Sequence, residues 1–369
     1  MKIEKIELRH VRLVLASPFT TSMGTEYDEE HIIVRIDGEG ITGWGESVAE
    51  GTPFYSYETV KTAWHIMEDF LVPAILGKNL TSINDAIQAW AKVRGHRMAK
   101  AGLEAALWDL FAKAERKSLS QMMRGVYSKI DVGVSIGIQS DPGTLVKKVE
   151  GYLKEGYKRI KIKIAPGSDI ELVKAVRKNY PDILLQVDAN SAFKLSDVDL
   201  FKAMDEYNLL LIEQPLSCDD IYEHSKLQSE LKTPICLDES IHSLADAQAA
   251  LELDSCHVIN IKPGRVGGFT ESILIHDLCD SQDIPVWCGG MLESGIGRAG
   301  NVALASLPNF VLPGDISASK RYYREDIIDP YFEVNSDGTM DVPTKPGIGV
   351  EVNMKRLDSV TENKKEFLF

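Results

Sequence analysis

Three carboxylates recur at a constant interval, and each follows a short apolar run. Asp188, Glu213 and Asp238 are 25 residues apart at each step and follow the runs LLQV, LLLI and PICL. A lysine stands one interval beyond each end, because Lys163 lies 25 residues before Asp188 and Lys262 lies 24 residues after Asp238. A strand and its return helix need about this length of chain, so the five residues are predicted to end successive strands of a parallel barrel.

This order of residues predicts proton chemistry at a metal site. Carboxylate oxygens bind hard cations, so the three acids are predicted to hold Mg²⁺, or another divalent cation such as Mn²⁺. If Lys163 ends the second strand and Lys262 the sixth, they stand opposite each other in a ring of eight strands. The pattern therefore predicts that a proton beside a carboxylate is removed on one face and can be returned on the other, while the metal stabilises the charge on the substrate oxygens.

The lysines are expected to work as bases only if their pKa values are lowered. A free lysine has a pKa of about 10.4 and is protonated at neutral pH. Lys161 shares a strand face with Lys163, with Ile160, Ile162 and Ile164 on the other face. We expect Lys161 and the metal to lower the pKa of Lys163, and Arg265 to act in the same way on Lys262. Lys161 could also be a solvated lysine at the strand end, but the shared face favours a substrate contact.

Other chemical motifs are weaker. A lone acid after an apolar run is typically a helix cap, and Glu239 is interpreted as a capping or supporting group beside Asp238. The stretch from Gly295 to Gly300 matches GxGxxG, a dinucleotide-binding pattern. It begins seven residues beyond Cys288, and no acid ends a strand about 20 residues further on. Its glycines are therefore predicted to shape the seventh strand–helix loop.

The N-terminal part is predicted to be an α+β unit. Residues 1–46 form a β-meander, with strands over 6–15, 31–36 and 41–44, and SPFTTSMG (17–24) is predicted to be a loop. Residues 56–118 have a helical pattern rich in Ala and Leu. Phe19, Phe54 and Tyr55 are expected to pack, on two loops that could close over the mouth of the barrel.

A strand–helix rhythm begins at Ile130. Asp141 and Pro142 predict the cap and first turn of the first return helix. Strands are predicted over 131–138, 160–164, 183–187, 209–212, 235–237, 257–261, 285–288 and 309–312. Eight strands close a barrel. The predicted domains are a cap over 1–128, a catalytic barrel over 129–320, and a polar tail over 321–369 that returns to the cap.

Composition narrows the classes of partner. The chain has 369 residues, 44% of them apolar and 26% charged, with a net charge of −14. This charge argues against nucleic acid, which is met by basic surfaces. Five cysteines without a CxxC pair predict buried free thiols in a reducing compartment. The N-terminus lacks a continuous apolar core, so we expect neither a signal peptide nor a membrane contact, and a cytoplasmic location.

A family resemblance runs through essentially the whole chain. The chain resembles the enolase superfamily, muconate-lactonising subgroup, and within it the o-succinylbenzoate synthase and N-succinylamino acid racemase family. The resemblance implies a modified (β/α)₇β barrel with an α+β cap. The segments that carry it are KIKI (161–164), VDAN (187–190), IEQP (212–215), LDES (237–240), NIKPGRVGG (260–268), WCGGMLESGIGRAG (287–300), PGDISAS (313–319), SPFTTSMG (17–24) and the turn at 43–46.

The resemblance also implies roles for individual residues. Lys163 would be the acid/base on one face and Lys262 its partner, and Asp188, Glu213 and Asp238 would bind Mg²⁺. Arg265 and Glu239 would support these groups from behind. The residues that fall where the family contacts a small carboxylate substrate are Ser135, Lys161, Asn190, Gly290, Met291 and Ile316, with Phe19 and Tyr55 on the cap loops.

Two reactions follow from the resemblance. The first is o-succinylbenzoate synthesis, in which proton abstraction beside the carboxylate of a succinyl-hydroxycyclohexadiene carboxylate and loss of hydroxide form an aromatic precursor of menaquinone. The second is racemisation of N-succinylamino acids, which Arg265 could favour by tuning Lys262. Dipeptide epimerases carry DxD after the last strand, and here only Asp315 is present. Muconate cycloisomerase and a catalytically silent metal-binding barrel stay open, as does a homo-oligomeric state.

Overall fold

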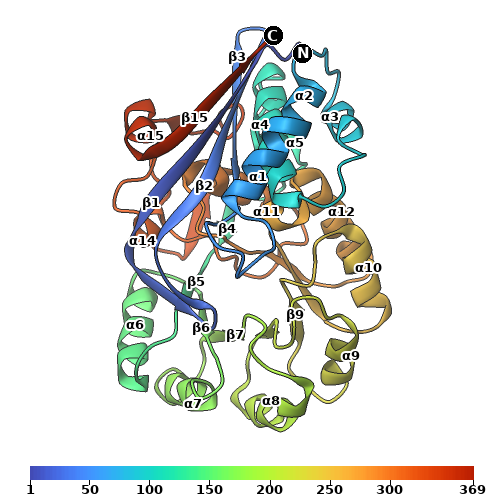
Figure 1. The fold of residues 1–369 in the computed structure, drawn as a ribbon. Helices are drawn as coiled ribbons and strands as arrows, with labels where there is room; N and C mark the ends of the chain where they lie inside the picture. The colour runs from blue at the N-terminus through green and yellow to red at the C-terminus, as the bar shows by residue number, and fades with distance from the viewer.

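The computed structural model describes residues 1–369, and it contains an antiparallel sheet with helices at one end and a parallel barrel at the other (Figure 1). The antiparallel sheet has the strand order β15-β1-β2-β3. Its strands are β1 (Lys5–Thr21), β2 (Gly24–Gly38), β3 (Ile41–Ser47) and β15 (Thr361–Leu368). The last strand of the chain therefore pairs with the first.

The N-terminal helices pack on one side of this sheet. They are α1 (Val60–Ile66), the π-helical turn η1 (Met67–Leu71), α2 (Val72–Ile75), α3 (Ile83–Ala89), α4 (Arg97–Ala114) and α5 (Leu119–Met122). Helix α4 lies against β3, where a Cβ atom on Gly45 would stand 2.2 Å from the Gly102 carbonyl oxygen. Glycine is thus required for this close approach. The predicted meander and helical region are confirmed.

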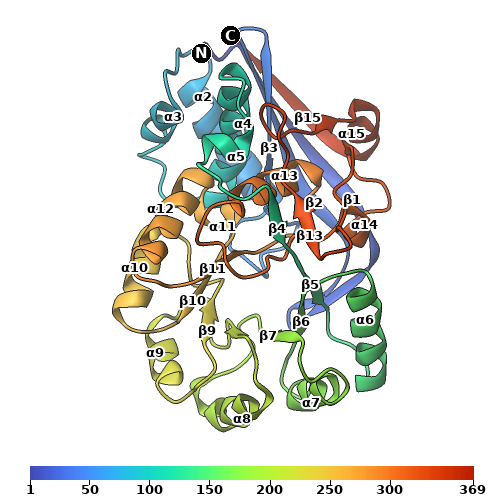
Figure 2. The same cartoon turned by 180° about the vertical axis from the view of Figure 1, so that it is seen from behind.

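Seven parallel strands form the barrel sheet in the order β11-β10-β9-β8-β7-β6-β5, with helices outside them (Figure 2). The strands are β5 (Gly133–Ile136), β6 (Arg159–Lys163), β7 (Leu184–Asp188), β8 (Ile212–Glu213), β9 (Ile235–Leu237), β10 (Val258–Ile261) and β11 (Val286–Cys288). The helical elements are α6 (Pro142–Lys154), α7 (Ile170–Asn179), η2 (Leu195–Asp197), α8 (Val198–Met204), η3 (Asp205–Tyr207), α9 (Tyr222–Gln228), α10 (Leu244–Glu252), α11 (Pro263–Val266), α12 (Phe269–Asp280) and α13 (Gly295–Leu304).

The eighth strand, predicted over 309–312, is wrong as a regular strand. This segment makes only isolated parallel bridges, from Phe310 to Val286 and from Gly314 to Val132. Pro308 and Pro313 flank it and have no N–H to donate, which limits the ladder that it can form. The two bridges still join β11 to the residue before β5, so the ring is closed by a short connector.

Two further strand predictions need correction. The first barrel strand, predicted over 131–138, is split at Val132 into β4 (Lys129–Asp131) and β5, and β4 pairs with β13 (Thr339–Asp341). SPFTTSMG is not a loop, because β1 continues to Thr21 and pairs with β2 beyond a register shift between Val14 and Phe19. The extended β1–β2 hairpin reaches the barrel mouth, where Ser22 donates a hydrogen bond to the Asn190 carbonyl oxygen.

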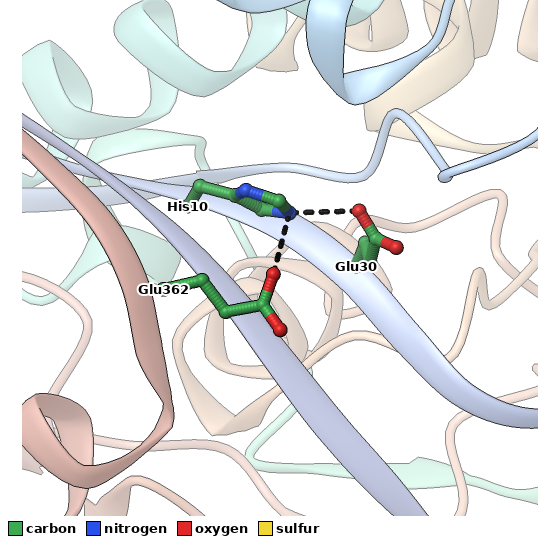
Figure 3. Close-up of side chains that lie close together, drawn as sticks. All are labelled: His10, Glu30 and Glu362. Atoms are coloured by element: carbon green, nitrogen blue, oxygen red, sulfur yellow. Dashed lines mark hydrogen bonds and ion pairs between the residues drawn. The ribbon is translucent and has the colours of Figure 1, made fainter.

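The remaining C-terminal elements are two helices that contact β1 and a separate two-stranded sheet. They are α14 (Ser319–Tyr322), β12 (Ile328–Asp329), β14 (Glu351–Val352) and α15 (Met354–Val360). Figure 3 shows His10, Glu30 and Glu362 meeting across three strands, with His10 Nε2 at 2.8 Å from Glu30 and 3.9 Å from Glu362. Arg12 binds the other oxygens of both glutamates at 2.7 Å. This cluster is an ion-pair network that ties β15 to the sheet.

Apolar side chains form separate cores under the cap and in the barrel. The antiparallel sheet contributes to both, because Leu8 and Val34 pack with the cap helices whereas Val11 and Ile33 pack with the barrel. Four cysteines are buried, Cys218 is partly buried, and all five are free thiols, as predicted. No helix has the length and apolar character needed to cross a bilayer.

The GxGxxG stretch is helical, so the prediction that its glycines shape a loop is wrong. Gly295 begins α13, and a Cβ atom there would stand 2.2 Å from Ile328, while one on Gly300 would stand 2.3 Å from the ring of Phe269. The glycines serve the close packing of this helix. Phe54 also differs from expectation, since its side chain is exposed.

Candidate active site

The carboxylates and lysines stand at the same edge of the barrel sheet. Lys163, Asp188 and Glu213 end β6, β7 and β8 and are direct register partners, whereas Asp238 and Lys262 are the residues that follow β9 and β10. Because the strands are parallel, all five side chains meet at their carboxyl ends. Three strands separate the two that carry the lysines, so the lysines lie on different walls.

Lys161 and Lys163 both point into this site and bind its acids. The Lys163 ammonium donates to Asp188 Oδ2 at 2.7 Å and to Asn190 Oδ1 at 2.6 Å. Lys161 contacts Glu213 Oε2 at 2.9 Å and Asp188 Oδ2 at 3.0 Å. Ile160, Ile162 and Ile164 are buried on the opposite face, as the strand period requires.

Lys262 is held by an acid and a phenol. Its ammonium lies 2.7 Å from Asp238 Oδ2 and donates to the Tyr55 hydroxyl at 3.1 Å, and that hydroxyl donates to Asp238 Oδ1 at 3.1 Å. Arg265 binds the same Asp238 oxygen and donates to the carbonyl oxygens of Ile241 and Asn260, each at 2.6 Å. Arg265 thus fixes Asp238 from behind, and Tyr55 carries the cap to the second lysine.

A layer of amide side chains orients the remaining groups. Asn260 donates to Glu213 Oε1 at 2.8 Å, and Asn190 donates to Glu239 Oε1 at 2.9 Å. Asn190 accepts from Lys163 through its other atom. Glu239 therefore supports the first lysine through Asn190 and does not cap a helix.

Burial and neighbouring charges shift the pKa values of the acids in the site. Burial and the negative charge of Asp188 raise the pKa of Glu213 well above its ordinary value. Burial opposes the charge of Asp188, but the ammonium groups of Lys161 and Lys163 overcome it and lower the pKa of Asp188. Burial, reinforced by Asp238, raises the pKa of Glu239 to about 7. Burial and neighbouring carboxylates therefore favour the neutral form of Glu213 and Glu239, whereas the ammonium groups favour the charged form of Asp188.

The expected lowering of the Lys262 pKa is wrong for the ion-paired site. Burial and Arg265 act in the expected direction, but the Asp238 carboxylate outweighs them and raises the pKa of Lys262 well above its ordinary value. An opposite charge at 2.7 Å dominates over a neighbouring cation. The same balance holds at Lys161, where Asp188 overcomes burial and raises the pKa.

The donor atoms fit a hard divalent cation. Asp188, Glu213 and Asp238 offer only oxygen and are buried. Asp238 Oδ2 has no aligned hydrogen-bond donor and contacts only the ammonium of Lys262, and Glu239 Oε2, next along the chain, is buried without a partner. Oxygens of the three acids do not gather within 4.8 Å of one another, whereas a ring nitrogen of His10 and oxygens of Glu30 and Glu362 do.

One pocket lies above these groups, and it brings together most of the predicted substrate contacts. Ile316 is buried outside the lining, and Arg265 and Glu239 lie behind it. The predicted residues that line the pocket are Phe19, Tyr55, Ser135, Lys161, Lys163, Asn190, Lys262, Gly290 and Met291. The lining residues that sequence reasoning missed are Thr21, Met23, Glu26, Glu50, Leu292, Asp315 and Tyr322. Thr21, Met23, Leu292 and Asp315 lie inside segments that carry the family resemblance, which could have suggested them. Glu26 and Glu50 lie close to the two cap segments, and no sequence signal pointed to Tyr322.

Asp315 is bound to two cations inside the barrel. Lys161 lies 2.5 Å from its Oδ2 atom, and Arg159 donates to its Oδ1 atom at 2.6 Å. These cations overcome burial and lower the pKa of Asp315. The carboxylate is therefore engaged within the protein and is not free to hold a substrate amine.

Family comparisons cover nearly the whole chain. Residues 3–124 match the mandelate racemase/muconate lactonizing enzyme N-terminal domain, and residues 144–356 match the enolase C-terminal domain-like family. This chain belongs to the enolase superfamily. The superfamily likeness extends to solved structures, since a member from Listeria innocua has 44% identity and a TM-score of 0.96, over 100% of this chain and 99% of that one. The fold prediction of a barrel with an α+β cap is confirmed.

Relatives within the superfamily are named for two reactions. The chain is 50% identical to an o-succinylbenzoate synthase from Geobacillus kaustophilus, over 100% of this chain and 98% of the relative. It is 47% identical to an N-succinylamino acid racemase from Amycolatopsis, over 99% of each. The predicted o-succinylbenzoate synthase and N-succinylamino acid racemase family is confirmed.

Proposed function

We propose that this protein is an o-succinylbenzoate synthase that also racemises N-succinylamino acids. One observation carries the proposal: Lys163, Lys262 and three buried acids line or underlie a single pocket, in a chain that is 50% identical to a synthase over its full length. The cap closes that pocket through Phe19 and Tyr55. A small carboxylate fits between the lysines.

In the synthase reaction, proton transfer is assigned to Lys163. Lys163 takes the proton beside the carboxylate of the succinyl-hydroxycyclohexadiene carboxylate, and Asn190 holds its ammonium group in place. The carbon–oxygen bond to the hydroxyl group then breaks, the ring becomes aromatic, and the proton and hydroxide leave as water. Lys161 and Lys262 provide positive charge around the oxygens.

A divalent cation, Mg²⁺ by its preference for oxygen, would be held by Asp188, Glu213 and Asp238 and would supply a Lewis acid for the substrate carboxylate. Asp188 also accepts contacts from the ammonium groups of Lys161 and Lys163, so these two lysines would share its carboxylate with the cation. Arg265 keeps Asp238 oriented throughout because it is anchored on backbone carbonyl oxygens.

Racemisation is the second candidate, and Lys262 favours it. This lysine lines the pocket on another wall and is joined to the cap by Tyr55. With the α-carbon between the lysines, Lys163 and Lys262 exchange protons on opposite faces. Epimerisation of dipeptides is disfavoured because Arg159 and Lys161 already bind Asp315.

Steady-state kinetics with the two substrates tests the proposal. Turnover of the succinyl-hydroxycyclohexadiene carboxylate to o-succinylbenzoate is expected, together with loss of optical rotation from either enantiomer of an N-succinylamino acid. If neither reacts while a dipeptide or muconate does, the assignment is wrong. Absence of α-deuterium incorporation in heavy water, with metal bound, would support the silent barrel.

A further inference from the structure

The cap reaches the pocket through the tip of the β1–β2 hairpin, residues 19–26. A register shift between Val14 and Phe19 separates the ladder of this hairpin tip from the rest of the sheet. Phe19 and Met23 line the pocket from the tip. Because the tip lies beyond the main ladder, its place over the pocket depends on contacts with the barrel.

Two hydrogen bonds fasten the tip beside Phe19. The Ile138 amide donates to the Thr20 carbonyl oxygen at 2.8 Å, and the Ser22 hydroxyl donates to the Asn190 carbonyl oxygen at 3.1 Å. Neither bond involves the Phe19 ring. Other contacts must therefore hold the ring against the pocket.

Arg321 supplies such a contact from α14. Its guanidinium carbon lies 5.8 Å from the centre of the Phe19 ring, within the distance of about 6 Å at which an aromatic face attracts a cation. It also lies 5.4 Å from the centre of the Tyr152 ring in α6 and 5.2 Å from that of Tyr322. One cation thus joins a ring of the cap to a ring of the barrel.

No acid competes for this guanidinium. The Arg321 side chain makes one hydrogen bond, from Nη2 to the Ser135 carbonyl oxygen at 3.1 Å, and its Nε atom is buried without a partner. The ion pair of α14 is made instead by Lys320 with Glu155. A partly buried cation without an acid is stabilised by the rings around it. The positions of the guanidinium and of the Phe19 ring therefore depend on each other.

We propose that Arg321 is a positioning residue, which holds the Phe19 ring against the pocket and so keeps the hairpin tip closed over bound substrate. Arg321 is not among the residues that line the pocket, so it acts through Phe19. The role in substrate binding rests on the function proposed above. Because Phe19 has no titratable group, loss of Arg321 is expected to weaken the binding of both substrates and to leave the proton steps unchanged.

Steady-state kinetics of a double-mutant cycle test the coupling between the two residues. Arg321→Met, which keeps an apolar stem without the charge, is expected to raise KM about fivefold, the scale of one cation–π contact, with little change in kcat. The same substitution in a Phe19→Leu background should leave KM at the value for Phe19→Leu alone. Arg321→Lys, which retains a cation, should recover part of the loss. Arg324→Met is the matched control, because Arg324 is exposed three residues further on.

Hydrogen exchange followed by mass spectrometry measures the hairpin tip without any turnover. In Arg321→Met, the amides of residues 19–26 are expected to exchange about fivefold faster, whereas those of residues 31–36, further along β2, keep the wild-type rate. If the wild type turns over neither substrate, the proposed function fails, and this exchange alone decides whether Arg321 holds the tip.

Three results would overturn the inference. The first is that Arg321→Met leaves KM unchanged in an active enzyme, or leaves exchange at the tip unchanged. The second is a rise in KM that persists in the Phe19→Leu background, since Arg321 would then act independently of Phe19. The third is faster exchange at residues 31–36 as well as at the tip, which would mean a general loss of stability.

Discussion

At the scale of single residues, the two lysines have different environments although both are buried. Lys163 is bound to Asp188 and Asn190, whereas Lys262 is bound to Asp238 and Tyr55. The Asn190 amide oxygen accepts a hydrogen bond from Lys163, whereas the Tyr55 hydroxyl accepts one from Lys262 and donates another to Asp238. The asymmetry suits one lysine that acts in both proposed reactions and another that is needed only in one.

Replacing the lysines separates the two proposed reactions. Lys163→Ala is expected to abolish both, and Lys262→Ala to end racemisation while synthase turnover falls less, because general acid–base catalysis contributes about 10²- to 10⁴-fold. Kinetics with each substrate and α-proton exchange in heavy water measure this. Lys174→Ala, on the surface of α7, is the control. A Lys262→Ala variant that still racemises would contradict the two-faced geometry.

Removal of a metal ligand is expected to change stability as well as activity. Mg²⁺ at 100 times its dissociation constant stabilises a one-site protein by about 2.7 kcal/mol, so the melting temperature should rise on addition. Asp238→Asn should lose most of this rise, and chelation should abolish turnover by the wild type. The exposed Asp182→Asn is the control. If Mg²⁺ leaves the melting temperature of the wild type unchanged, the proposed metal site is contradicted.

The sequence predicted the carboxylates and lysines because strand ends repeat at a regular interval. It did not predict Glu26, Glu50 or Tyr322 as pocket residues, since they come from cap segments and the C-terminal part, which tertiary packing alone brings to the mouth. It also gave the wrong sign for the pKa of Lys262. The spacing shows that Arg265 is near in sequence, but it cannot show that the Asp238 carboxylate lies 2.7 Å from the Lys262 ammonium group.

At the scale of elements, close packing decides where the sequence patterns mislead. GxGxxG suggested a loop, but Gly300 lies inside α13 because no side chain fits against Phe269. The eighth strand failed for the opposite reason, since its apolar pattern is correct but two prolines limit its hydrogen bonds. The periodicity of apolar residues therefore located the strands and helices. The backbone properties of glycine and proline determined which segments form regular strands or helices.

Two glycine-to-alanine substitutions measure this packing. Gly300→Ala should destabilise the protein by about 1–3 kcal/mol because its Cβ atom would overlap the buried Phe269 ring. Gly151→Ala is the matched variant, since nothing lies within 4 Å of its Cβ position in α6, and it should stabilise by about 0.5–1 kcal/mol. Urea denaturation gives both values. Equal effects at the two positions would show that helix propensity, and not packing, dominates.

At the scale of the whole molecule, a buried carboxylate of the cap sheet, paired with a histidine of the same sheet, is hydrogen-bonded to the barrel. Glu46 on β3 accepts hydrogen bonds from the Ser294 backbone at 3.0 Å, the Ser294 hydroxyl at 2.6 Å and the Gly297 backbone at 2.8 Å, at the start of α13. His31 on β2 lies 2.7 Å from the same carboxylate. The negative end of this pair sits at the helix N-terminus, where the helix dipole favours it.

The pair makes the join between cap and barrel depend on pH. Burial opposes the charge of His31, but Glu46 overcomes it and raises the pKa of His31 above about 6.5, its unfolded value. A raised folded pKa contributes stability that is complete below about pH 6.5 and is lost as the pH rises through the folded value. Burial likewise opposes the charge of Glu46, but His31 lowers the pKa of Glu46, so its contribution persists until the pH falls through that lowered value.

His31→Gln should therefore lower the melting temperature most near pH 5.5 and progressively less at higher pH. The difference from the wild type is expected to be about 2 °C or more at its largest. Melting curves between pH 5 and 9 measure it, with His257→Gln as the control because His257 forms an exposed pair with Asp254 that contributes little. A wild-type advantage that is constant across this range would mean that His31 is neutral in the folded protein. In that case Glu46 would hold the cap through its hydrogen bonds to α13 alone.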